Sequence, residues 1–152
     1  LELVTAILEG HGEAFVALVR EVADRNLPPR AALTALIEVY ITYFVEHPNF
    51  LRTQLRSGIS WALGTTLNAP NHLQYSADIH ALQAGIFQRG VAAGEFVDEE
   101  PGYLSRLFSV IDQVLLADWV ANGMKAAPAE LIARMQAQVD RSFFAPATRA
   151  SG

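Results

Sequence analysis

Apolar side chains recur every three or four residues along most of this chain. In segment 1–24 they include Val4, Ile7, Leu8 and Phe15, and this spacing places them on one face of a helix. The alternation of apolar and polar residues that is typical of strands is almost absent. The pattern therefore predicts an all-α fold of six helices, at about residues 1–24, 30–46, 49–57, 72–92, 101–122 and 128–144.

Prolines, glycines and short polar runs separate these segments. Pro28 and Pro29 cannot continue a helix but suit the start of a new one, and Pro48 interrupts the pattern again. Gly123 lies where a C-terminal cap belongs, and SGISWALGTTLNAPN (57–71) has the composition of loop and turn. With no internal repeat or boundary in the sequence, we expect one helical domain over 1–152 that ends in a frayed tail from residue 145.

The predicted helix 101–122 is apolar almost all the way round. Residues three and four apart share a helix face, and one face is bulky: Leu104, Phe108, Ile111, Leu115 and Trp119. A second face is smaller and flatter: Leu107, Val110, Val114, Ala117 and Ala121. A chain of six helices can bury the first face, whereas the second face needs a further partner.

A second copy of the chain is the partner that we expect. The last helix has its own apolar stripe, so the final two helices can supply half of a four-helix bundle, and a two-fold mate supplies the other half. The candidate interface residues are Leu107, Val110, Val114, Ala117, Ala121, Leu131, Met135, Gln138, Val139 and Ser142. The alternative is a monomer in which helix 101–122 is wholly internal.

Composition narrows the possible partners. Apolar residues make up 51% of the 152 positions, above the usual range of about 45–50%, and the mean hydropathy is +0.21. No stretch approaches the roughly 18 uninterrupted apolar residues of a membrane span, so we expect a ligand cavity or a partner and no membrane. The net charge of −5 argues against direct binding to nucleic acid. The chain has no cysteine, which excludes disulfides and suits the cytoplasm.

Three stretches resemble the TetR family of transcriptional regulators. GIFQRGVAAGEFVDEEPGYLSRLFSVIDQVLLADWVANG (85–123) is similar to the family's penultimate-helix region. YFVEHPNFLR (43–52) resembles the segment where a helix ends at Glu-His-Pro, and LELVTAILEGHGEAF (1–15) resembles the helix that leaves the DNA-binding head. The resemblance covers essentially the whole chain. It departs from the family at Gln113, where many members have glycine, and in lacking the N-terminal helix-turn-helix head.

The resemblance implies the C-terminal ligand-binding and dimerisation domain of such a regulator, with a mostly apolar pocket inside each subunit. The chain starts at Leu1 within a predicted helix, so we expect an upstream head. The candidate ligand-binding residues are His11, Phe15, Phe44, Trp61, Tyr75, Ile79, Gln83, Phe87, Phe108, Asp112, Leu115 and Trp119. Trp61 stands out because it lies in the irregular segment. For each aromatic residue the alternative is core packing, and for Asp112 it is a hydrogen-bonded structural carboxylate.

The expected function is therefore effector sensing by a dimeric repressor that binds a mostly apolar small molecule and contacts DNA only through the missing head. The alternative is a helical adaptor that binds other proteins and has no ligand. We expect no enzyme, because the sequence has neither a Glu-x-x-His pair nor an H-E-x-x-H motif, and GISWA around Ser60 only half matches a nucleophile elbow. We also expect no cofactor and no metal, since His72 and His80 have no third ligand placed near them by the sequence.

Overall fold

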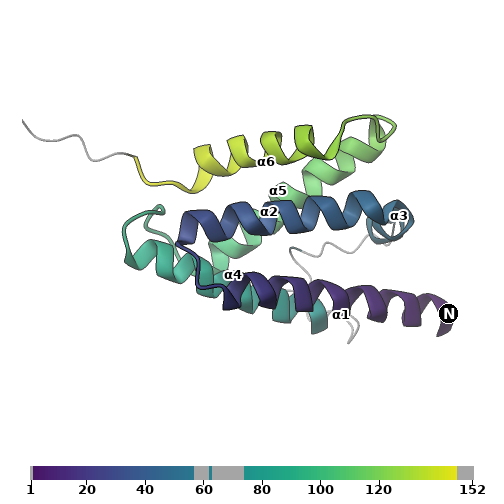
Figure 1. The fold of residues 1–152 in the computed structure, drawn as a ribbon, viewed down its shortest axis with the longest axis horizontal. Coiled ribbons are helices and arrows are strands. Elements are labelled where there is room, and N and C mark those ends of the chain that lie inside the picture. Colours follow the sequence, from purple (N-terminus) through teal and green to yellow (C-terminus); the bar gives the residue numbers. More distant parts are fainter. Residues whose placement is uncertain (1, 57–61, 63–73, 147–152) are drawn as a thin grey trace, which may run out of the picture.

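A computed structural model describes residues 2–56, 62 and 74–146. This part of the chain contains six helices and no strand, so the predicted all-α fold is confirmed (Figure 1). The helices are α1 (Glu2–Asp24), α2 (Pro29–Glu46), α3 (Pro48–Arg56), α4 (Gln74–Ala92), α5 (Pro101–Ala121) and α6 (Pro128–Phe143). Where the predicted limits fall on described residues, they differ from these by at most one residue. None of the described helices has the length and apolar character needed to cross a membrane.

Proline stands at the start of four of these helices. Pro29, Pro48, Pro101 and Pro128 each occupy the first helical position, where the missing N–H costs nothing because that group has no partner inside the helix. Pro29 and Pro48 thus lie within the helices that they were predicted only to precede. The start of α5 is further fixed by Glu100, whose carboxylate accepts hydrogen bonds from two backbone N–H groups of the first turn.

Helix α2 occupies the centre of the fold and contacts all the other described helices. In Figure 1, α1, α2 and α6 form the nearer layer, and α4 and α5 lie behind it. The buried side chains of α2 cover about half of its circumference: Ala32, Leu33, Leu36, Ile37, Tyr40, Ile41 and Phe44. The scarcity of charge in the sequence 30–46 therefore reflects this broad buried face, as expected for a central helix.

The segment after α6 is fastened to the α4–α5 connection. Phe96 forms a single antiparallel bridge with Phe144, the two rings stack with centroids 5.7 Å apart, and the Ala145 N–H donates to the Glu95 carbonyl. The guanidinium of Arg30 lies 3.8 Å from the centre of the Phe144 ring. The prediction of a frayed tail is therefore wrong at Ala145, because backbone pairing and aromatic packing fix this residue.

We expect Gly90→Ala to destabilise the fold. A Cβ atom at Gly90 would lie 2.1 Å from Cδ2 of Phe96, whose side chain is buried and packs on Phe87. Such overpacking costs roughly 1–3 kcal/mol of unfolding free energy. Gly85→Ala on the same helix is the matched control, because nothing lies within 4 Å of its Cβ position and alanine is the better helix former by up to about 1 kcal/mol. Urea denaturation that showed equal effects for both variants would contradict this packing.

Candidate functional site

A row of hydrogen-bonded polar side chains runs through the interior between α2, α4 and α5. The Tyr40 hydroxyl donates to Oε1 of Gln83 over 2.6 Å. The Gln83 amide nitrogen donates to the hydroxyl oxygens of Ser105, at 2.9 Å, and Ser109, at 3.1 Å. All four side chains are buried. We call these four residues the polar row; they satisfy one another and tie three helices together.

Asp112 follows Ser105 and Ser109 along α5 but forms none of the hydrogen bonds of the polar row. Ser105, Ser109 and Asp112 are spaced by four and three residues, which puts them on one helix face. Asp112 is only 3% exposed, and its Oδ1 atom has no hydrogen-bond partner. The sequence leaves open whether Asp112 is a hydrogen-bonded structural carboxylate, and at Oδ1 the structure shows no such bond.

Burial controls the protonation of this carboxyl. Removal from water raises the pKa of Asp112 to about 8 because the charged form loses its hydration. The pKa of the Tyr40 hydroxyl is also raised well above its ordinary value, first by burial and second by the nearby Asp112 charge. At neutral pH both groups are therefore mostly uncharged, and the interior holds a carboxylic acid that can donate or accept a hydrogen bond.

The polar row reaches the half-buried His80 at one end. Nδ1 of His80 lies 3.1 Å from the Ser105 hydroxyl, which also donates to the His80 carbonyl. His80 and the two serines were not among the predicted ligand-binding residues. The available signal was the pair of small polar residues at 105 and 109 on the inner face of an otherwise apolar helix, in register with Asp112.

A second cluster joins α1 to the C-terminal end of α2 and to α3. The His11 ring stacks on Phe50 with centroids 4.1 Å apart, and its Nδ1 is hydrogen-bonded to the Tyr43 hydroxyl. Tyr43 in turn stacks on His47, with centroids 4.3 Å apart. Burial, and then the charge of His47, lower the pKa of His11. The neutral imidazole thus acts as an aromatic and hydrogen-bonding contact that fixes α1 on its neighbours.

The predicted ligand-binding residues fall into several groups in the structure. Gln83 and Asp112 meet at the polar row, and the Tyr40 ring packs on Phe15 and Phe108 with centroids 5.5 and 6.1 Å apart. Phe44 packs on Phe15 and faces the His11 cluster. Trp61 lies outside the described residues. The remaining members are two half-buried residues, Tyr75 and Ile79, and three buried ones, Phe87, Leu115 and Trp119.

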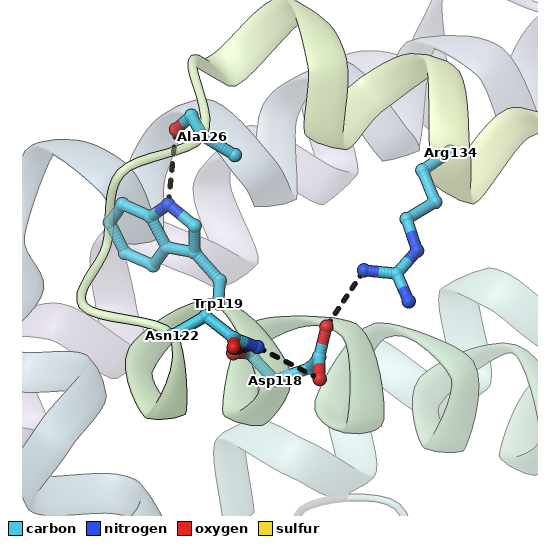
Figure 2. A network of polar contacts seen from close by, with 5 residues as sticks. All are labelled: Asp118, Trp119, Asn122, Ala126 and Arg134. Atoms are coloured by element: carbon cyan, nitrogen blue, oxygen red, sulfur yellow. Dashed lines mark hydrogen bonds and ion pairs between the residues drawn. The ribbon is translucent and has the colours of Figure 1, made fainter.

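For three of these residues, contacts within the chain account for the position of the side chain without a ligand. Phe87 packs among the rings of the core, including Phe143 at 5.2 Å. Tyr75 lies against Gly12, where a Cβ atom would come within 2.3 Å of its ring. The indole N–H of Trp119 donates to the Ala126 carbonyl at 3.1 Å, which ties α5 to the turn before α6 (Figure 2). We assign these residues to packing.

The outer face of α5 forms a groove with α6. The groove has a volume of about 490 Å³, and its apolar lining consists of Val110, Ile111, Val114, Leu115 and Met135. Its polar lining consists of Asp118, Arg134, Gln138 and Arg141. Asp118 and Arg134 form an exposed ion pair of 2.7 Å across the two helices (Figure 2). Val114 is 63% exposed, an unusually open position for a valine on such an apolar helix.

The structure divides the predicted interface residues between the surface and the core. Leu107, Val114 and Ala121 are exposed and Val110 and Ala117 are half-buried, so the flat face of α5 does point outward. Gln138 and Ser142 of α6 are exposed as well and hydrogen-bond each other. Leu131, Met135 and Val139 are at most 3% exposed.

The assignment of Leu131 and Val139 to an outward surface is therefore corrected. They belong to the stripe that α6 packs inward, where α6 contacts α2 and α5. Met135 is equally buried, yet it forms part of the groove floor. On α6 the surface available to a partner thus consists mainly of polar side chains beside this one apolar residue.

Comparisons with known proteins support the helical fold but do not indicate a function. No family model matches the chain, and no curated protein matches it. Among solved structures, the chain is similar to a protein with unknown function from Rhodococcus sp. RHA1. The TM-score is 0.69, the match covers 91% of this chain and 70% of that one, and the identity is 16%. At this identity the likeness establishes a shared helical fold and nothing about activity.

Proposed function

We propose that this chain is the effector-sensing and dimerisation domain of a ligand-responsive transcriptional regulator of the TetR type. The observation that carries the proposal is the two-sided character of α5. Its inner face presents Ser105, Ser109 and Asp112 to the interior, and its outer face presents exposed apolar side chains beside α6. A helix of this kind suits a domain that binds a ligand on the inner side of the helix and a second copy of the chain on its outer side.

The partner for the outer face is a second copy of the chain. At a rise of 1.5 Å per residue, α5 and α6 are about 31 and 24 Å long. With helices about 10 Å apart, their outer face covers roughly 600 Å², close to the ~800 Å² that each partner buries in a standard interface. Val110 and Val114 would lie at the centre of this interface, and the Asp118–Arg134 pair would belong to its polar rim.

The ligand would bind in the interior near the polar row. Ligand sites in proteins are mostly apolar and contain a few polar groups that orient the ligand. Here Asp112 supplies an unsatisfied buried oxygen close to Tyr40, and an unpaired buried polar atom is costly enough to need a compensating partner. A small molecule that fills this role would also contact α2 and α4, and it could shift their packing against α1.

The output would pass through α1 toward a DNA-binding head ahead of Leu1. Two heads in a dimer read half-sites about 34–36 Å apart, so a small tilt of α1 changes whether both can bind. A ligand produces this change only if it binds one conformation more tightly than the other. We propose that the regulator is a repressor in the cytoplasm and that the domain itself has no catalytic role.

Native mass spectrometry of the purified chain tests the two parts of this proposal together. We expect the mass of a dimer, and an apolar small molecule retained from the expression host in a 1:1 ratio with the subunit. A monomer that retains no small molecule but captures helical peptides through the α5–α6 groove would favour the adaptor instead. A dimer that retains only phosphorylated or highly polar compounds would contradict the proposed apolar ligand.

A further inference from the structure

The unsatisfied oxygen of Asp112 lies in an interior whose other polar groups are already paired. Gln83 uses its carbonyl oxygen for Tyr40 and its amide nitrogen for the serines. The Ser105 hydroxyl donates to the His80 carbonyl. The row therefore has no amide donor left for Asp112 Oδ1, although this atom is fully buried. The Ser109 hydroxyl accepts from Gln83, and its own proton does not reach Oδ1 in the structure, so this oxygen is open to a donor from a ligand.

The surroundings of Asp112 also favour one sign of charge. In the described part of the chain, no Lys or Arg forms an ion pair with Asp112. Its titratable neighbours from the packed helices are Tyr40 on α2 and, further along the row, His80 on α4. The hydroxyl of Tyr40 is close enough to feel the Asp112 charge, the Tyr40 ring packs on Phe15 and Phe108, and the faces of aromatic rings attract cations. A cationic group therefore suits this carboxyl better than an anion does.

We propose that the effector carries a protonated amine on an apolar body, and that the amine pairs with the Asp112 carboxyl between α2, α4 and α5. This inference rests on the proposed effector-sensing function and adds the chemical class of the effector. The ammonium group donates to Oδ1 of Asp112, and the apolar body lies among the aromatic rings. The effector class is therefore lipophilic amines, and neutral or anionic compounds of the same shape bind more weakly.

Pairing with a cation also moves a proton. The free carboxyl has a raised pKa of about 8, so at pH 7 it is mostly protonated. An ammonium group beside it stabilises the carboxylate, and the carboxyl proton leaves for the solvent while the amine keeps its own. Binding of each amine molecule should thus release about one proton at pH 7, whereas binding of a neutral compound should release none.

Isothermal titration calorimetry with matched compounds tests the inference. The probes are benzyl, 1-naphthylmethyl and n-octyl bodies, each as the amine, the alcohol and the carboxylate, titrated into the whole chain at pH 7. We expect the best amine to bind at least about 10-fold more tightly than its alcohol. In Asp112→Asn that amine should lose at least about 30-fold, while the alcohol changes little. Asp98→Asn, at an exposed carboxyl in the α4–α5 connection, should behave as the wild type.

Each other outcome overturns a stated part of the account. If alcohols bind as tightly as amines, the interior ligand site stands and the amine class is wrong. If Asp112→Asn keeps the amine preference, the pairing of the amine with Asp112 is wrong. If none of the nine compounds binds at millimolar concentration, the proposed ligand site fails together with the inference. Titrations of the wild type in phosphate and in Tris give the number of protons released, and this second readout does not depend on how the variants fold. An amine that binds without releasing a proton would also refute the pairing.

Discussion

Asp112→Asn should make the folded chain more stable at pH 8 by roughly 5 kcal/mol while leaving it almost unchanged at pH 4. The folded carboxyl has a pKa of about 8, whereas in the unfolded chain it ionises near pH 3.9. Between these pH values the folded state binds more protons than the unfolded state, so stability falls as the pH rises. Asparagine has nearly the same shape and no charge to bury, so it removes this loss.

Urea denaturation of both proteins at several pH values measures the effect. The difference in unfolding free energy between variant and wild type should be small near pH 4 and should grow until about pH 8. Asp118→Asn serves as the control, because its exposed pair with Arg134 contributes at most about 1 kcal/mol. If the stability of Asp112→Asn followed that of the wild type at every pH, the buried carboxyl would not be the isolated group that the structure shows.

Val114→Glu should convert the proposed dimer into folded monomers. Val114 is 63% exposed in the single chain, so glutamate there costs the monomer little. At a two-fold interface the substitution buries two carboxylates. The arginines of the groove are already engaged, Arg134 with Asp118 and Arg141 with Gln138. We therefore expect at least about a 100-fold rise in the dimer dissociation constant, about 3 kcal/mol. Sedimentation velocity over a range of concentrations gives the constant directly.

Thr42→Glu is the matched control for this substitution. Threonine has the shape of valine, and Thr42 is exposed on α2 rather than on the α5–α6 groove. It should leave the dimer intact, and circular dichroism should show native helix content for both variants. A Val114→Glu protein that sediments like the wild type would place the interface on another face of the molecule.

The sequence was sufficient to predict the helices and the two faces of α5. Proline at the first helical position and Gly123, whose φ of 81° suits a residue without Cβ, limit the helices by local chemistry alone. The face of Leu107 and Val114 could be recognised because helical periodicity depends only on spacing. Periodicity does not indicate which neighbour covers a helix face. The stripe of Leu131 and Val139 was therefore assigned to the interface with a second copy of the chain, whereas α6 packs it against its own subunit.

The candidate site was predictable only in part. Gln83 and Asp112 were expected to face an interior cavity, and both side chains are buried. Tyr40, Ser105 and Ser109 were missed, since their roles depend on hydrogen bonds between helices that are far apart in sequence. Trp119 was placed in a pocket because it is large and lies on the inner face. Its indole N–H in fact meets a carbonyl in the following turn, which no helical pattern indicates.

The central claim is that this chain is the sensing half of a dimeric DNA-binding regulator, and selection of DNA by the product of the whole gene tests it most directly. The protein would be mixed with sheared genomic DNA, the retained fragments sequenced, and the stoichiometry on one fragment measured by gel shift and sedimentation. The account predicts a protein dimer on a two-fold symmetric sequence, and binding that weakens when a lipophilic amine is added. A whole-gene product that stays monomeric, or that retains no DNA above background, would contradict it.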